Sequence, residues 1–393
     1  MKSRISSEFN QDSARQLAIA LWSWSVFQGC IEKNGVQCDH RHCPSGRITK
    51  IQRYLQYYEA VVSAYMDATS TSTRDVKTHS DVLTIISILK SHPDAPSSEL
   101  RQLASPSTNT NPQAVHSDSQ ADAVALGVKT MLMLDPSALH HSSDRLEKGT
   151  FRVHWKEDVP LSKYIQDSFP VGNHIILSHN TSELFADAKR QLRAVNLKRR
   201  LKITIRATSD IRNHLLFDRR NSVLEVYHYT SFLKEQLRVT RDLGDCSSPS
   251  SSLKKGVLPR QLVLEVLDSL QGTLFPLSDP KSKKIARLLV KKCSFNPDIL
   301  NFEVSSVRRI GEESVPYVYL ADRLANLYDE LQTPQSRSWL QRFTQRKSST
   351  RHMMMATLAG VVFAIVLGMA SLALISYQTW IAYQAWKHPV EPH

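Results

Sequence analysis

The sequence predicts an α+β protein that ends in a single membrane-spanning helix. Apolar residues recur at spacings of three and four in the N-terminal part, β-type runs alternate with helical ones in the middle, and one long uncharged stretch lies near the C-terminus. The 393 residues suffice for about two to three domains. With 22% charged and 41% hydrophobic residues, the composition argues against a collagen, a coiled coil, a multi-span membrane protein or a disordered chain.

Residues 1–95 are expected to form a helical unit. An apolar stripe at helical spacing predicts a long helix, and its members are Ile48, Ile51, Leu55, Tyr58, Val62 and Tyr65. A second short helix is expected at residues 82–89. A further stripe follows a helix cap at Asp12-Ser13 and comprises Leu17, Leu21, Trp24, Phe27 and Ile31. We interpret these stripes as facing the core rather than a partner.

The N-terminal segment has a competing interpretation as a secretory signal peptide. Lys2 and Arg4 precede the apolar stretch 17–27, as in such signals. Glu8 and Asp12 interrupt the basic region, however, and no small-x-small cleavage site follows cleanly. The segment is therefore predicted to be an amphipathic helix of the folded protein.

Cysteine and histidine side chains cluster within a short loop. The cluster comprises Cys30, Cys38, His40, His42 and Cys43. Thiolate sulfur and imidazole nitrogen are the ligands that zinc prefers, and four of these five could close a tetrahedral structural site. The spacing is not that of a standard zinc finger, so solvated or merely packed side chains are the alternative. No other cofactor is expected, and disulfides are disfavoured in a reducing compartment.

Two polar stretches, 96–120 and 244–256, are predicted to be linkers. Between them lies a mixed unit, residues 121–243, in which helices and strands alternate. That succession indicates a small α/β or α+β sheet. The expected helices are 121–134, 182–197 and 231–239, and the expected strands are 153–155, 174–178, 201–207 and 223–229.

Much of the net charge of +13 lies in two basic runs, residues 189–220 and 281–292. The first run is predicted to form a face that binds an anionic membrane. Each basic residue held near such a membrane strengthens the attraction by about 1 kcal/mol. Its candidate residues are Arg190, Arg193, Lys198, Arg199, Arg200 and Lys202. A solvated face is the alternative. Nucleic acid is less favoured, because no aromatic stacking pattern accompanies the charge.

The third unit, residues 257–335, is expected to follow a helix-helix-hairpin-helix order. Its predicted elements are helices 259–273 and 282–293, strands 302–309 and 315–320 with a turn at Gly311, and a helix ending at Leu331. The same order occurs in part of a winged-helix module. Because a third, recognition-type helix is not obvious, nucleic-acid binding is treated as an alternative.

Sequence motifs for catalysis are not visible. The twelve glycines form neither a dinucleotide-binding nor a phosphate-binding loop, and the loop 178–182 contains no glycine. Neither a nucleophile elbow nor a His-Glu-x-x-His pair occurs. We therefore expect a protein that is not an enzyme.

The segment 353–377 carries no charged residue and is apolar on every face. At about 1.5 Å per residue it reaches about 37 Å, more than the roughly 30 Å hydrocarbon core of a bilayer. Aromatic residues typical of a membrane interface stand at its end, namely Tyr377, Trp380, Tyr383 and Trp386. One transmembrane helix at 352–380 and a short tail at 381–393 are therefore predicted.

The flanks of this span predict its orientation. Lys387 and Glu391 are the charged residues of the tail. The juxtamembrane segment 336–351 has no acidic residue and contains Arg337, Arg342, Arg346, Lys347 and Arg351. The positive-inside rule then places the bulk of the chain in the cytosol. Because so little chain follows the span, insertion after synthesis is expected, as for a tail-anchored protein.

Small residues fall at every fourth position of the predicted span and form one ridge: Ala356, Gly360, Ala364 and Gly368. Such ridges let two helix backbones approach closely inside a bilayer. We interpret the ridge as a surface for self-association or for pairing with another membrane helix. The alternative is that the ridge has no such role, because small residues are frequent in membrane spans.

Distinctive segments run from Trp155 to Pro170, Thr208 to Asp218, Val226 to Leu233, Leu258 to Glu265 and Tyr383 to Trp386. Together they resemble a group of functionally uncharacterised proteins from filamentous fungi. The resemblance implies a cytosolic α+β region followed by a membrane helix, without an activity or site residues. The C-terminal segment also resembles two-helix magnesium transporters, but it has one span and Gly368-Met369-Ala370 where those proteins have Gly-Met-Asn, so ion transport is not expected.

The sequence thus predicts a single-pass, tail-anchored membrane protein whose cytosolic units bind a protein partner or an anionic surface without catalysis. A membrane-tethered regulatory or nucleic-acid-binding protein is the alternative. A true wing and recognition helix would favour that alternative, whereas a deep pocket lined by convergent polar groups would favour an enzyme.

Overall fold

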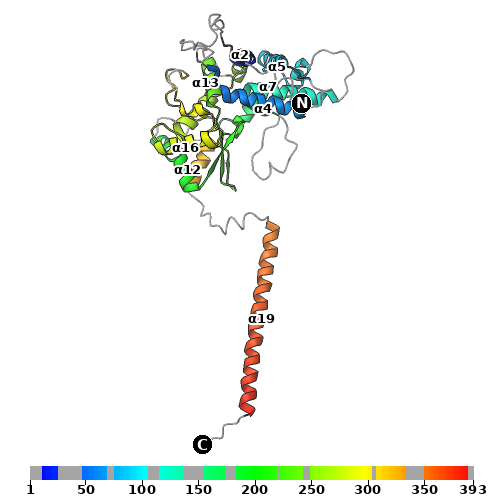
Figure 1. Cartoon of the computed structure of the whole chain (residues 1–393), viewed down its shortest axis with the longest axis vertical. Coiled ribbons are helices and arrows are strands. Elements are labelled where there is room, and N and C mark those ends of the chain that lie inside the picture. The colour runs from blue at the N-terminus through cyan, green and yellow to red at the C-terminus, as the bar shows by residue number, and fades with distance from the viewer. Residues whose placement is uncertain are drawn as a thin grey trace. The chain divides into compact units, whose positions relative to one another are not determined.

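The N-terminal part of the chain is helical, as the spacing of its apolar residues predicts (Figure 1). Its helices are α2 (Gln11–Trp22), α4 (Gln52–Ala68), α5 (His79–Ser91), α6 (Ser97–Ala104) and α7 (Val115–Leu132). In α4 the predicted stripe is buried. The computed structural model describes residues 11–24, 47–68, 75–104, 115–136, 155–172, 183–219, 221–241, 248–302, 307–332 and 349–387.

Helix α2 is shorter than the predicted amphipathic stripe. It ends at Trp22, because Ser23 adopts a left-handed backbone conformation with φ of 50°. The centroid of the Trp22 ring lies 5.5 Å from that of Tyr54 and 5.8 Å from that of Phe232. These aromatic contacts hold the end of α2 in the core. Phe27 and Ile31 lie outside the described residues.

A small mixed sheet follows, with strand order β1-β3-β2. β1 (Thr204–Thr208) pairs in parallel with β3 (Val223–Tyr227), and β2 (Phe217–Asp218) pairs with β3 in the antiparallel sense. The register sets Ile205 opposite Leu224, and both side chains are buried. One face of the sheet therefore belongs to the core, and the predicted α+β class is confirmed, with much more helix than strand.

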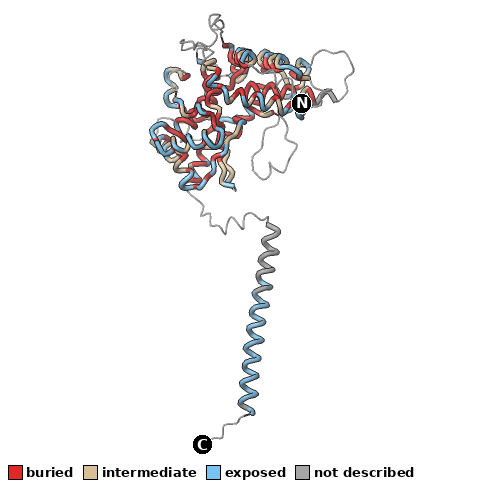
Figure 2. Tube along the Cα trace, in the orientation of Figure 1, coloured by how far each residue is buried: buried red, intermediate tan, exposed pale blue. Residues whose placement is uncertain are grey.

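Further helices precede and follow the strands in the chain. They are α9 (Leu161–Ser168), α11 (Glu183–Gln191), α12 (Ala194–Leu201), α13 (Thr230–Val239), α14 (Pro249–Lys254), α15 (Arg260–Asp268), α16 (Pro280–Lys292) and α17 (Ala321–Gln332). Short helical turns lie at η2 (Ile211–Asn213), η3 (Ser269–Leu274) and η4 (Pro297–Leu300). One hydrophobic cluster extends from α2 to α17, and Figure 2 shows its buried residues throughout this part of the chain.

The chain divides into two units, residues 1–333 and residues 334–393, which we call the globular unit and the C-terminal unit. The predicted subdivision of the globular unit is not confirmed. Both predicted linkers contain helix: α6 occupies 97–104 and α14 occupies 249–254. Leu100 and Leu253 from these helices are fully buried, so the polar stretches also contribute to the common core.

The predicted hairpin is wrong in its second strand. Residues 315–320 form no strand, and residues 303–306 of the first lie outside the described residues. The backbone N–H groups of Val318, Tyr319 and Leu320 donate to the Glu265 carboxylate at 2.8–2.9 Å, so this carboxylate takes the place of a partner strand. Pro316 further removes one donor that a ladder would need.

The predicted helix 182–197 is two helices, α11 and α12. The side-chain amide of Asn196 donates to the carbonyl oxygens of Arg190 and Gln191 at 3.1 Å, and these bonds terminate α11. Arg193 then has an extended backbone and begins α12. The predicted strand 174–178 lies outside the described residues, and Trp155, from the strand predicted at 153–155, is not in a strand.

The C-terminal unit contains α19 (Ser349–Lys387). Its segment Phe363–Gln384 is long and apolar enough to cross a membrane, and none of that segment is buried against the protein. The 22 residues reach about 33 Å at about 1.5 Å per residue, which matches the hydrocarbon core. Figure 2 shows exposed residues along this part of α19.

Candidate functional site

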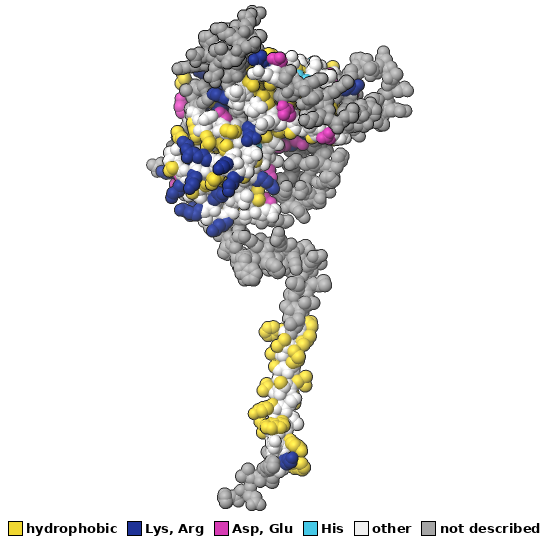
Figure 3. Space-filling view, in the orientation of Figure 1, with side chains coloured by type: hydrophobic (Ala, Val, Ile, Leu, Met, Phe, Trp, Pro, Cys, Tyr) yellow, Lys and Arg dark blue, Asp and Glu magenta, His cyan; other side chains and the backbone are white. Residues whose placement is uncertain are grey.

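Helices α12 and α16 contact each other and carry basic residues on their outer sides. Figure 3 shows Lys and Arg side chains gathered over these two helices, with hydrophobic side chains between them. We call this surface the basic face. Its exposed members are Lys198, Arg199, Arg200, Lys202, Lys281, Lys284, Arg287, Lys291 and Lys292.

The spacing of its residues explains why α16 carries half of this face. The carboxylate of Asp279 accepts the N–H groups of Lys281 and Ser282 and begins the helix. Ser282, Ala286 and Leu289 face the core, which leaves the basic residues on the opposite side. The N–H group of Val195 donates to Ser282 Oγ at 3.3 Å, so a hydrogen bond joins α12 to α16.

The predicted anionic-surface residues do not all lie on the basic face. Lys198, Arg199, Arg200 and Lys202 all belong to the basic face. Arg190 is exposed on α11 but lies 3.9 Å from Asp187, and Arg193 is half-buried at the start of α12. Sequence reasoning treated the run 281–292 separately, although the spacing of its lysines on one side of a helix was a visible signal of a surface.

Other basic residues of the run 189–220 are structural. Lys189 Nζ lies 2.6 Å from Asp268 Oδ2, and both side chains are largely buried. The buried Arg212 guanidinium pairs with Asp210 and donates to the Tyr164 hydroxyl at 2.9 Å. These cations hold the fold together and are not available to a partner.

Two buried histidines have roles inside the core. Burial, with a contribution from Arg323, lowers the pKa of His214 to about 3. His214 Nδ1 accepts the Tyr227 N–H, so its proton lies on Nε2, which donates to Ser269 Oγ at 2.7 Å. Burial and the charge of Arg53 lower the pKa of His228 to about 4. Both rings are therefore neutral at physiological pH.

A pocket of about 440 Å³ lies beside the start of α4. Lys50, Arg53, Asn296, Asp298 and Asn301 are among its lining residues. Two of its polar side chains contact buried residues of the core. The Asp298 carboxylate is directed to a buried lysine of α13, and the Asn296 amide donates to a buried serine of the same helix at 2.7 Å.

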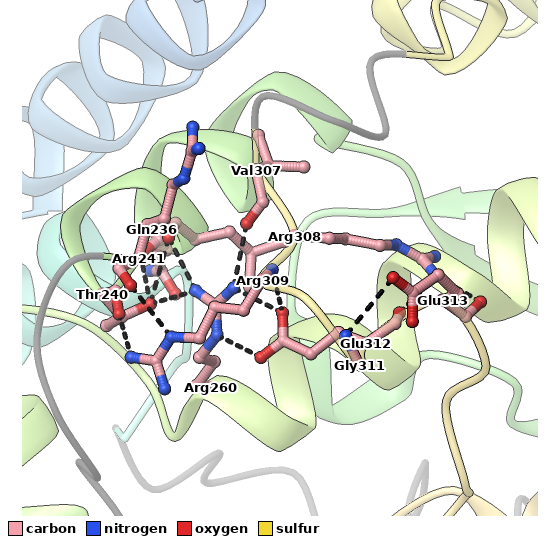
Figure 4. Close-up of polar contacts among 11 residues, drawn as sticks. Gln236, Thr240, Arg241, Arg260, Val307, Arg308, Arg309, Gly311, Glu312 and Glu313 are labelled. Carbon is pink, nitrogen blue, oxygen red and sulfur yellow. Dashed lines mark hydrogen bonds and ion pairs between the residues drawn. The ribbon is translucent and has the colours of Figure 1, made fainter.

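A network of arginines holds the turn around Gly311, as Figure 4 shows. The Arg260 guanidinium pairs with the Glu312 carboxylate at 2.6 Å and donates to the Val307 carbonyl at 2.9 Å. Gly311 has φ of 91°, which only glycine adopts easily. The turn fully exposes Ile310. The ion pair and the hydrogen bond to the Val307 carbonyl thus hold this turn.

The candidate zinc ligands Cys30, Cys38, His40, His42 and Cys43 lie outside the described residues. Within the described part of the chain, no group of three His, Cys, Asp or Glu side chains could hold a metal ion. In the small-residue ridge, Gly360, Ala364 and Gly368 are exposed on α19. A Cβ added at either glycine would meet no atom within 4 Å. Pairing of this ridge with another helix stays a prediction.

Sequence patterns did not reveal the pairs Lys189–Asp268, Lys234–Asp298 and Arg260–Glu312, because each joins residues distant in the chain. Comparison with protein families, with curated proteins and with solved structures finds no match to this chain. The resemblance to fungal proteins stays a prediction.

Proposed function

We propose that this chain is a single-pass, tail-anchored membrane protein whose globular unit acts as an interaction or scaffold module on the cytosolic side of the membrane, without catalysis. Helix α19 carries the proposal. Its segment Phe363–Gln384 exposes large apolar side chains along its length, among them Phe363, Leu372 and Leu374, each more than half exposed. A lipid environment would cover this surface, which water would solvate unfavourably.

The aromatic residues of α19 support a membrane interface at its C-terminal end. The rings of Tyr377 and Trp380 are 6.2 Å apart, and those of Tyr383 and Trp386 are 6.4 Å apart. Such rings favour the headgroup level of a bilayer. Together with the basic segment 336–351, this arrangement favours a cytosolic globular unit and a translocated tail.

A non-catalytic role is supported by the use of the buried ionisable groups. Burial raises the pKa of Glu265 to about 6, yet its carboxylate is occupied by three backbone N–H groups. His214 and His228 are likewise hydrogen-bonded within the core. Ionisable groups with shifted pKa values mark a candidate catalytic site when they lie in a cleft. The hydrogen bonds of Glu265, His214 and His228 within the core support a role in packing instead.

Membrane integration can be tested by alkaline extraction of membranes from cells that express the full chain. We expect the protein to stay in the membrane pellet. The variant Leu372→Arg with Ile375→Arg should move to the soluble fraction, because each arginine at the centre of a span costs about 2.5–3.5 kcal/mol. A matched control, Val171→Arg with Ile310→Arg, changes exposed apolar residues of the globular unit and should stay in the pellet. Release of the unaltered protein would refute the anchor.

A further inference from the structure

We propose that the basic face binds the anionic headgroups of the bilayer that holds α19, with the Leu288 side chain entering the headgroup layer. The inference rests on the proposed function, since it assumes an anchored chain. It assigns a partner to a surface that two separate segments of the chain build.

The basic face has a charge of one sign. Neither α12 nor α16 contains Asp or Glu. Asp279, the nearest acidic residue in sequence to α16, is engaged with the backbone N–H groups that begin this helix. Among the described residues, no carboxylate lies within ion-pair distance of the nine basic side chains. The face is therefore complementary to a surface of negative charge.

Leu288 distinguishes a lipid partner from a polynucleotide. It is 46% exposed, and Lys284, Lys291 and Lys292 are its neighbours on the helix surface. A basic helix face with an apolar residue among the cations suits the boundary between headgroups and acyl chains. A single-stranded nucleic acid would be expected to stack on aromatic rings, and α12 and α16 contain none.

The face is preformed. Ala286 and Leu289 of α16 and Leu197 of α12 are buried beneath it, and the Val195–Ser282 hydrogen bond fixes one helix on the other. Binding therefore requires ordering of the long basic side chains but not of the backbone.

The membrane anchor limits how far the globular unit can move from the bilayer. Residues 333–348 connect α17 to α19, and sixteen residues span at most about 56 Å when fully extended. Such a connection keeps the local concentration of headgroups high, so weak individual contacts suffice. Each basic residue near an anionic surface should strengthen the bound state by about fivefold.

The test uses the full chain in nanodiscs of phosphatidylcholine, with or without phosphatidylserine. Acetylation rates of single lysines are measured by mass spectrometry. In the discs with phosphatidylserine, Lys198, Lys202, Lys284 and Lys291 should react several-fold more slowly, and high salt should restore their rates because it screens the attraction. The exposed Lys77 and Lys156 of the globular unit should react equally in both discs.

Variants test whether the protection of the lysines depends on the basic face or on the positive charge of the globular unit in general. Lys284→Glu with Lys291→Glu should abolish the protection of Lys198 and Lys202, whereas Lys77→Glu with Lys156→Glu should preserve it. Leu288→Asp should reduce the protection several-fold without altering the core, because Leu288 is partly exposed.

Equal lysine reactivity in both discs would overturn the proposal. Protection that appears only when a single-stranded oligonucleotide is added would also overturn it and would favour nucleic-acid binding. Both results are distinguishable from failure of the proposed function, in which the chain would not remain in the disc at all.

Discussion

Lys234 Nζ lies 2.7 Å from Asp298 Oδ2, and the two side chains are 2% and 5% exposed. The ammonium group also donates to the Asn301 carbonyl at 2.7 Å. The pair thus joins α13 to η4 and the residue after it. A buried ion pair of this kind sets the position of both elements, because either charge alone would be costly to bury.

Removal of one charge should therefore lower the free energy of unfolding much more than removal of both. Lys234→Met is expected to lower the free energy of unfolding by about 3–5 kcal/mol, since it leaves the Asp298 charge buried without its partner. Lys234→Met with Asp298→Asn should recover most of that loss. Urea unfolding of the full chain in detergent measures both values.

The exposed pair Lys163–Asp167 is the matched control, with side chains 58% and 43% exposed. Lys163→Met should change the free energy of unfolding by less than about 1 kcal/mol. Equal losses for Lys163→Met and Lys234→Met would contradict the structural role of the buried pair.

The two buried histidines should destabilise the fold in acid. The pKa values of His214 and His228 are lowered to about 3 and about 4, so the unfolded chain binds more protons than the folded one below about pH 6.5. Their stabilisation is complete above that pH and is lost as pH falls toward the folded values. Between about pH 8 and about pH 5 the loss should be about 2 kcal/mol per histidine.

The measurement is the free energy of unfolding against pH for the unaltered chain and for His228→Asn. Asparagine can accept the Asn296 N–H in place of Nδ1 but does not titrate. The variant should show a shallower acid slope, and an identical slope would contradict the assignment. The raised pKa of Glu265 acts in the opposite direction between about pH 4.5 and about pH 6, so the difference between the two proteins is the informative quantity.

Glu265 should hold the segment before α17. Glu265→Gln replaces one carboxylate oxygen by an amino group, which cannot accept from the Val318, Tyr319 or Leu320 N–H groups. We expect a loss of about 1–3 kcal/mol. Hydrogen exchange of these three amides should accelerate, while the amides of α5 keep their protection. Unchanged exchange at 318–320 would refute the contact.

Loss of the Arg260–Glu312 pair should free the turn around Gly311. In Glu312→Ala, trypsin should cleave after Arg308 and Arg309 about tenfold faster or more, because a hydrogen bond to a charged group contributes about 1.5–3 kcal/mol. Glu313→Ala is the matched control, since the Glu313 side chain accepts only a longer bond, 3.3 Å, from the Gly311 N–H. Equal cleavage rates of the two variants would contradict the proposed restraint.

The elements that the sequence predicts well are those that depend on local spacing. The stripe of α4, the strand β3 and the apolar character of α19 are all visible in runs of neighbouring residues. The missed features depend on contacts between distant residues. Glu265 replaces the expected strand partner of residues 318–320 from more than fifty positions away, and no periodicity reveals such a contact.

The candidate site shows the same division. The basic composition of the runs 189–220 and 281–292 is evident in the sequence, but only the fold separates Lys198 on the surface from Lys189 in its buried pair with Asp268. The joining of α12 and α16 in one face likewise depends on tertiary contacts, among them the Val195–Ser282 hydrogen bond. Side-chain type predicts charge, and tertiary packing decides which charges a partner can reach.

The central claim, an anchored chain with a cytosolic globular unit, is tested most directly by protease protection in sealed microsomes with a different tag at each end of the full chain. The proposed topology predicts that protease removes the N-terminal tag and the globular unit and leaves a small protected fragment with the C-terminal tag. Protection of the N-terminal tag, or loss of both tags without detergent, would contradict it.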